Sequence, residues 1–224
     1  MKTTAITLMA GLVLASSASA GTPATVTAPH SGTGLWTWFA GGSGGYLTDL
    51  EQPMYSLNLG MEYKRPGACG SHSIYVQVGY AEDDDSYGYY PDLPGAKSQE
   101  SSIDMHIIPI TLDYKYEGTL SGHLNYYAGL GMGIAVVHTS CDWSWSQAIL
   151  NGYGKASDDQ TDVRFYGEIF AGLSYDVTDA CQIYAGARYI LMDNVDRYAH
   201  VRDASYDAGL NHNVLLELGL RYHF

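Results

Sequence analysis

The sequence predicts an all-β protein, an eight-stranded antiparallel up-and-down transmembrane barrel, over most of its 224 residues. Three observations carry this prediction. Eight segments alternate apolar and polar residues with the period of a β-strand, the connections between them alternate between short and long, and helical periodicity is nowhere sustained. The composition agrees, because 20 Tyr and 26 Gly favour strands and turns over helices.

Residues 1–20 are expected to be a signal peptide that is cleaved on export. Lys2 precedes an apolar stretch over residues 5–15, and an Ala-Ser-Ala cleavage site occupies residues 18–20. This apolar core is too short to cross a membrane as a helix, and no later run approaches the ~18 apolar residues that a spanning helix needs. Residues 21–33, rich in Pro, Thr, Ala and Gly, are expected to form a flexible linker before a barrel domain at 34–224.

The eight expected strands are taken in chain order from their alternation, with approximate ends. They are residues 34–41, 54–64, 72–81, 102–116, 123–137, 162–176, 181–191 and 211–224. In the first of them the outward face is ambiguous, since Trp36 and Trp38 oppose Leu35 and Phe39. The fourth changes phase, and a β-bulge near residues 107–109 would restore a single apolar face.

The last strand shows the two faces most clearly. One parity is wholly apolar, and the other carries charged, polar and small residues. The apolar parity comprises Val214, Leu216, Leu218, Leu220, Tyr222 and Phe224, and the other comprises Leu215, Glu217, Gly219, Arg221 and His223. Successive strand side chains point to opposite faces, so this pattern is typical of a strand with lipid outside and a polar lumen inside.

The connections predict the two rims of the barrel. Short turns are expected at 65–71, 117–122 and 177–180, and long loops at 42–53, 82–101, 138–161 and 192–210. An even number of strands places both termini at the short-turn rim, which faces the periplasm in barrels of this kind. Most acidic residues fall in the long loops, so one rim is acidic. The net charge of −13 argues against nucleic acid as a partner.

Most charges within the strands fall on the inward parity and predict a charge network in the lumen. Its members are Glu62, Lys115, Arg164, Glu168, Arg188, Glu217 and Arg221. Eight strands leave an interior just wide enough for side chains to fill. A static network in which the three arginines pair with the three glutamates is therefore favoured over an ion path.

Several other motifs are possible sites, and none is assigned a catalytic, cofactor-binding or metal-binding role. The acidic run at 82–85 lacks the spaced ligands of a calcium loop and is typical of a solvated loop. Trp143 and Trp145 fall in an expected long loop, where packing or interface contact is favoured over a binding surface.

The cysteines and histidines leave two further questions. Cys69 and Cys181 are both expected near the short-turn rim, and whether they pair is left open. The only candidates for catalysis are His106 near Asp104, and a group at 200–205 that contains His, Asp and Ser. Neither lies in a recognisable motif, so an enzyme is not expected.

The chain resembles the small eight-stranded outer-membrane barrels, the OmpA-like and opacity-protein group, over residues 34–224. The resemblance rests on the architecture and on the C-terminal segment. In those families the last strand ends in Phe, and the barrel assembly machinery reads it. The resemblance therefore implies an assembly signal at Leu216, Leu218, Leu220, Tyr222 and Phe224, and a location in the bacterial outer membrane. No peptidoglycan-binding domain is expected after the barrel.

The expected function is that of a scaffold without a cofactor. Its lumen would be filled by side chains, and its acidic surface loops would serve adhesion or interaction. The expected partners are outer-membrane lipid, the barrel assembly machinery and an extracellular partner that binds through residues 82–101 and 138–161. Three alternatives stay open: a narrow channel or transporter for ions or small solutes, a lipid-modifying outer-membrane enzyme, and a soluble lipocalin-like barrel.

Overall fold

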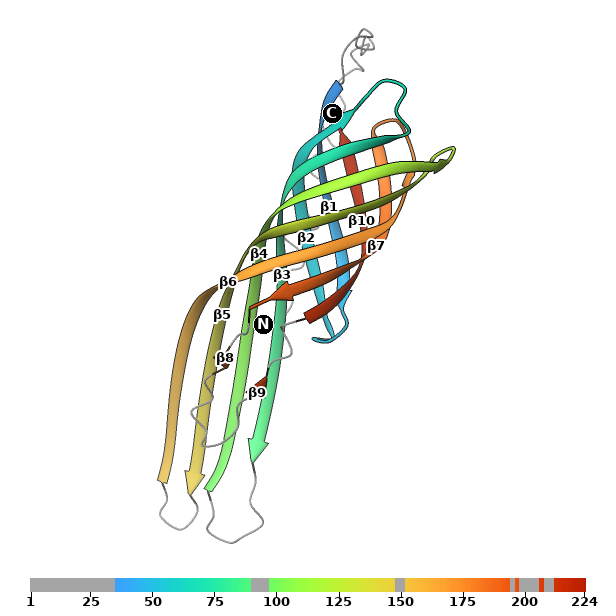
Figure 1. Cartoon of the computed structure of the whole chain (residues 1–224). Helices are drawn as coiled ribbons and strands as arrows, with labels where there is room; N and C mark the ends of the chain where they lie inside the picture. The colour runs from blue at the N-terminus through green and yellow to red at the C-terminus, as the bar shows by residue number, and fades with distance from the viewer. Residues whose placement is uncertain (1–34, 90–96, 148–151, 194–195, 198–205, 208–211) are drawn as a thin grey trace, which may run out of the picture. The chain divides into compact units, whose positions relative to one another are not determined.

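The computed structural model describes residues 35–89, 97–147, 152–193, 196–197, 206–207 and 212–224. The chain divides into two units, Met1–Thr33 and Gly34–Phe224, and the second contains every described strand. The barrel strands are β1 Leu35–Leu47, β2 Gln52–Lys64, β3 Gly70–Tyr89, β4 Lys97–Ser121, β5 Leu124–Gln147, β6 Gly152–Asp176, β7 Cys181–Met192 and β10 His212–His223 (Figure 1). The short β8 Asp196–Arg197 and β9 Tyr206–Asp207 form a separate two-stranded ladder.

The eight long strands form one closed antiparallel sheet. Their order around the ring is β1-β10-β7-β6-β5-β4-β3-β2, and β1 closes the ring by pairing with β10 from Phe39↔His223 to Leu47↔Leu215. This confirms the prediction of an eight-stranded up-and-down barrel. In the described part of the chain, no helix is long and apolar enough to cross a membrane.

The outward face of the barrel is apolar. Leu218 is 65% exposed and Ile169 is 59% exposed, and the aliphatic residues at alternate positions of the neighbouring strands are exposed in the same way. Trp36 and Trp38 belong to this face, while Phe39 is fully buried, which settles the orientation of β1. A closed sheet of this kind satisfies its backbone hydrogen bonds internally, and its apolar outside is suited to lipid.

The prediction of a long first loop is wrong, because β1 and β2 continue into it. β1 extends to Leu47, β2 begins at Gln52, and only residues 48–51 connect them. The glycine-rich run at 41–45 is typical of a loop when the sequence is taken alone. In the structure it is extended and paired on both sides, with β10 and with β2.

The sequence predicts loops at residues 82–101 and 138–161, and most of these residues are strand. β3, β4, β5 and β6 continue in register well past the ends of β2 and β7 (Figure 1). We call this part of β3–β6, residues 82–89, 97–106, 138–147 and 152–165, the hairpin extension. Both of its faces carry polar residues, so the alternation that marks a half-buried strand is missing from its sequence.

The expected bulge near residues 107–109 is also wrong. β4 pairs with β3 in one unbroken register through this region, as Val78↔Ile110 and Ala81↔Ile107 show. Pro109 and Ile107 are buried inside the barrel, whereas Ile108 and Ile110 are exposed outside. The apparent change of phase in the sequence arises because both faces of β4 are apolar at this level.

The lumen is layered. At the end that carries the hairpin extension it is filled by apolar side chains, contrary to the expected polar interior; they are Leu47, Met54, Ala81, Met105, Ile107, Ala135, Val137, Tyr166, Ile190, Met192 and Leu215. A second cluster of aromatic rings lies farther toward the short turns; it comprises Phe39, Tyr75, Tyr127, Phe170 and Tyr184. The charged side chains of the lumen lie around this second cluster.

Candidate functional site: the charged lumen

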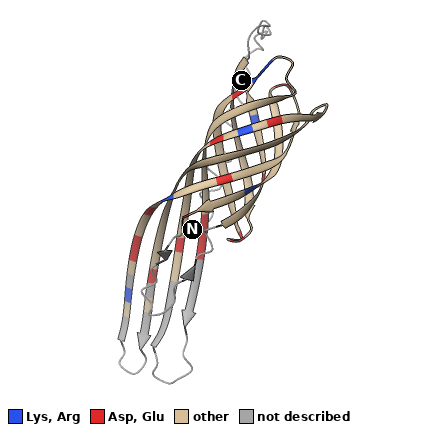
Figure 2. Ribbon diagram, viewed as in Figure 1, with Lys and Arg blue, Asp and Glu red and all other residues tan. Residues whose placement is uncertain are grey.

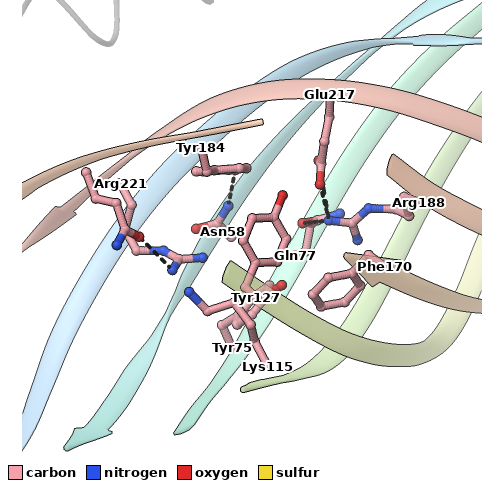
Figure 3. Close-up of a pocket in the computed structure, with 11 residues that line it drawn as sticks. Asn58, Tyr75, Gln77, Lys115, Tyr127, Phe170, Tyr184, Arg188, Glu217 and Arg221 are labelled. Atoms are coloured by element: carbon pink, nitrogen blue, oxygen red, sulfur yellow. Dashed lines mark hydrogen bonds and ion pairs between the residues drawn. The ribbon is translucent and has the colours of Figure 1, made fainter. Parts of the chain in front are cut away.

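Arg188 on β7 is the centre of one charge cluster. Its Nη1 donates to Glu168 on β6. Its Nη2 lies 3.3 Å from Glu217 Oε1 on β10 and 3.3 Å from Gln77 Oε1 on β3 (Figure 3). Asp113 Oδ2 on β4 lies 3.9 Å from Nη1. One guanidinium therefore faces three carboxylates, each contributed by a different strand.

Arg221 on β10 is the centre of the second cluster. Its Nη1 donates to Gln182 Oε1 at 3.3 Å and lies 3.8 Å from Glu117 Oε2 on β4. Lys115 also pairs with Glu117, which accepts further hydrogen bonds from Gln182 Nε2 at 2.6 Å and Ser174 Oγ at 3.0 Å. These hydrogen bonds and ion pairs replace part of the hydration that the side chains lose on burial.

Aromatic rings separate and orient the two guanidinium groups. Arg221 Cζ lies 4.4 Å from the centre of the Phe39 ring, and Arg188 Cζ lies 4.7 Å from that of Phe170. A cation over an aromatic face is attracted by the ring quadrupole, and the interaction gains strength when water is excluded. The two rings therefore help to hold the arginines in the lumen, and Figure 3 shows Phe170 beside Arg188.

The cavity left between these side chains is very small. It has a volume of ≈ 10 Å³ and is lined by residues of both clusters, including Arg188, Glu217, Arg221 and Lys115. A cavity of about 10–15 Å³ on this measure holds roughly one water molecule. A wider vestibule of ≈ 340 Å³ opens at the short-turn end, where Glu62 and His223 are among the lining residues.

The structure brings together five of the seven residues expected in the lumen network. Lys115, Glu168, Arg188, Glu217 and Arg221 are all buried within it. The other two lie elsewhere. Glu62 is at the vestibule, where its Oε2 lies 2.7 Å from His223 Nε2, and Arg164 is partly exposed and pairs with Asp162 at 3.1 Å. The structure therefore places these two residues outside the two clusters around Arg188 and Arg221, and their membership of the network stays a prediction.

Two members of the lumen network are missing from the sequence-based prediction. Asp113 has the inward parity but is not among the predicted members, and Glu117 falls in a predicted turn. Glu117 lies on β4, in register with Ser71 of β3 and Tyr127 of β5. The unbroken odd parity from Met105 through Glu117 is the signal that could have found both residues.

The acidic run at 82–85 lies on β3, where successive side chains alternate between the two faces of the sheet. Figure 2 shows acidic residues on several strands of the hairpin extension. Among the residues that the structure describes, no group of three His, Cys, Asp or Glu side chains is arranged to hold a metal ion. Trp143 and Trp145 fall within β5, but their side chains lie outside the described part.

The structure describes one of the two catalytic candidates and both cysteines of the short-turn rim. His106 lies on the outward side of the hairpin extension, with its Nδ1 3.0 Å from the Tyr80 hydroxyl and its ring stacked on His138. The catalytic candidates at 200–205 lie outside the described residues. Cys69 is exposed, Cys181 is half-buried, and no disulfide joins them.

The residues of the expected assembly signal all lie on the outward face or at its end. Leu216, Leu218, Leu220, Tyr222 and Phe224 are between 47% and 66% exposed. The backbone N–H of Phe224 donates to Trp38 O at 2.9 Å, so the chain end is tied to β1.

Several solved structures that are similar to this chain are bacterial outer-membrane or surface proteins. A major outer membrane protein from Thermus thermophilus is 13% identical with a TM-score of 0.48, and the match covers 85% of this chain and 100% of that one. Neisserial surface protein A is 15% identical with a TM-score of 0.43, covering 86% and 100%. The outer membrane enzyme PagL is 12% identical with a TM-score of 0.40, covering 82% and 98%.

At these identities the similarity concerns the fold alone. No protein-family model matches the chain, and the search of characterised proteins found no significant match. The fold agrees with the resemblance to small outer-membrane barrels drawn from the sequence.

Proposed function

We propose that the chain is an integral outer-membrane protein whose closed barrel is a rigid scaffold for the hairpin extension at the cell surface. In this proposal residues 1–20 are removed on export, the barrel assembly machinery inserts the chain through its last strand, and lipid covers the apolar outward face. The observation that carries the scaffold role is the buried charge network across the lumen. It links β3, β4, β6, β7 and β10 through side chains, and the cavity of ≈ 10 Å³ between them has room for roughly one water molecule.

The lumen network supports a scaffold rather than a channel. A hydrated ion needs a continuous water-filled path, whereas the lumen is filled by the network, the aromatic cluster and the apolar layer in succession. Opening a path would separate ion pairs that have no water to replace their partners, and breaking a buried pair costs about 3–5 kcal/mol. The network therefore opposes conduction.

The hairpin extension supports an interaction role. Its strands carry ten acidic residues against three Lys and Arg: Glu82, Asp83, Asp84, Asp85, Glu100, Asp104, Asp142, Asp158, Asp159 and Asp162 against Lys97, Lys155 and Arg164. A surface of one sign of charge accelerates the approach of an oppositely charged partner and repels like-charged ones. The extracellular partner in this proposal is accordingly a basic one.

Single-channel recording tests the scaffold role. Protein refolded in detergent and inserted into a planar bilayer is expected to give no conductance steps, and a heat-modifiable shift on gel electrophoresis verifies that the inserted protein is folded. Regular steps that persist in independently refolded samples would contradict the proposal and favour the narrow channel. Release of the folded protein into buffer without detergent would instead favour the lipocalin-like barrel.

A separate measurement addresses the enzymatic alternative. Lipid A from cells that express the chain and from cells that lack it is compared by mass spectrometry. Identical profiles are expected. A mass change that depends on the chain, and that is lost on His106→Ala, would overturn the assignment of a non-enzymatic scaffold.

A further inference from the structure

The buried charges of the lumen do not balance. Among the residues that the structure describes, seven charged side chains are at most 6% exposed: the acids Asp113, Glu117, Glu168 and Glu217 and the bases Lys115, Arg188 and Arg221. Four acids and three bases leave one excess negative charge. An isolated buried charge is far too costly to remain uncompensated, so the lumen must hold one more positive charge.

The excess negative charge lies on two of the four buried carboxyl groups. Glu117 is satisfied by Lys115, Gln182 and Ser174. Glu217 is satisfied by Arg188, with Ser43 Oγ 3.3 Å from its Oε2. In contrast, within the described part of the chain Asp113 is only 1% exposed and its polar neighbours besides Arg188 are neutral or acidic, namely the Thr111 hydroxyl and Glu168 itself. Neither oxygen of Asp113 nor Glu168 Oε2 has a hydrogen-bond partner of good geometry.

The backbone brings these two carboxyl groups together. Asp113 on β4, Gly131 on β5 and Glu168 on β6 lie directly opposite one another in the register. A Cβ added at Gly131 would clash with Asp113 Oδ1 and would lie 3.0 Å from Glu168 Cγ. The missing side chain of Gly131 therefore leaves a space that both carboxyl groups enter from opposite sides.

Arg188 does not satisfy both groups at once. Its Nη1 donates to Glu168, and the same nitrogen is 3.9 Å from Asp113 Oδ2, beyond hydrogen-bond distance. The titratable and charged groups that face the pair are Tyr75 of β3, Tyr166 of β6, Arg188 of β7 and Glu217 of β10. Arg188 is the one cation in this described set.

We propose that Asp113 and Glu168 form a buried site that binds one proton. The proton comes from solvent when the barrel closes and converts one carboxylate into a carboxylic acid, whose O–H donates to the remaining carboxylate across Gly131. Two carboxyl groups at close range share a proton in this way because both cannot stay ionised. With the proton bound, three negative and three positive charges remain, and the buried set is neutral.

Infrared spectroscopy of the refolded barrel tests this site. The wild type at neutral pH is expected to show the C=O band of a protonated carboxylic acid, shifted in D₂O. Asp113→Asn and Glu168→Gln are each expected to abolish the band, because the remaining carboxylate is ionised beside Arg188. Asp176→Asn is the matched control: Asp176 accepts hydrogen bonds from Asn125 and Gln182 near the vestibule, and its replacement should leave the band unchanged.

Two results would overturn the proposal. One is a wild-type spectrum without the band at neutral pH, and the other is a band that survives both substitutions. If the wild type lacks the band, its unfolding midpoint is compared in sodium and in choline. A midpoint that depends on sodium would assign the site to a metal cation and would reject the proton. A wild-type spectrum without the band rejects the proposal even if a variant fails to fold, and a band that is lost in either folded variant supports it. The heat-modifiable gel shift reports folding in each case.

Discussion

Glu62 on β2 and His223 on β10 join across β1, with Glu62 Oε2 and His223 Nε2 2.7 Å apart at the vestibule. The two strands are not neighbours in the sheet, since β1 lies between them. This contact therefore closes the seam of the barrel with side chains as well as with the backbone ladder, and it fixes the end of the chain against the first hairpin.

Replacement of His223 by Ala is expected to lower the free energy of unfolding by about 1.5–3 kcal/mol, since a partly buried hydrogen bond to a charged group is lost. Denaturant unfolding of the barrel refolded in detergent measures the change. His123→Ala is the comparison variant, because His123 is exposed and its ring lies beside that of Tyr175. Equal effects of the two substitutions would contradict a role for the Glu62–His223 contact.

Replacement of Arg188 by Leu is expected to destabilise the barrel by about 3–5 kcal/mol, because it leaves the carboxylates of Asp113, Glu168 and Glu217 without their cation. The same unfolding measurement applies. Arg164→Leu removes the partly exposed pair with Asp162 and is expected to cost at most about 1 kcal/mol. A combined Arg188→Leu, Glu168→Gln and Glu217→Gln variant should recover part of the loss.

The glycines of β1 provide an adjacent pair with opposite expectations. A Cβ at Gly45 would lie 2.5 Å from Leu216 O and 2.6 Å from Leu215 Cδ1, whereas a Cβ at Gly44 would lie 3.5 Å from Tyr55 Cδ1. Gly45→Ala is therefore expected to destabilise the barrel by about 1–3 kcal/mol. Gly44→Ala is expected to be neutral or stabilising by about 0.5–1 kcal/mol. If Gly44→Ala lowered the unfolding midpoint more than Gly45→Ala, the result would contradict the inward direction of Gly45.

The proposed assembly signal makes a prediction that separates assembly from stability. Phe224→Ala is expected to reduce the heat-modifiable form recovered from the outer-membrane fraction of cells, while refolding of the purified chain in detergent stays normal. Tyr175→Ala, which truncates an exposed outward aromatic residue outside the hairpin extension, is the control and should assemble normally. If both variants lost the same amount of the heat-modifiable form in cells, the effect of Phe224→Ala would be explained by lost lipid contact and not by a lost assembly signal.

The strand number and pairing could be predicted because most barrel strands carry one apolar, exposed face and one inward face. Leu216, Leu218 and Leu220 are outward, as their alternation predicts. Prediction from alternation fails where a strand has no apolar face or has two apolar faces. Residues 82–89 of β3 have no apolar face, so their pairing is not visible in the sequence. Both faces of β4 at Ile107 and Ile108 are apolar, so the pattern predicts a bulge that does not exist.

The partners within the lumen could be predicted only in part. The inward parity identifies Glu168, Arg188 and Glu217, and the structure places all three together. It does not show which charges lie at the same height, because that depends on the stagger of the strands around the ring. Arg164 and Glu62 have the right parity but lie at opposite ends of the barrel.

The unequal strand lengths give the barrel a mechanical property. β4 and β6 each run for 25 residues from the short turns to the far end of the hairpin extension, without a break in their pairing with β5 beyond the shift at Thr119/Ser121. At ~3.3 Å per residue each is about 80 Å long. A pull on the far end of the extension acts along these strands and loads their ladders in shear, so a force applied there is transmitted directly into the wall of the barrel.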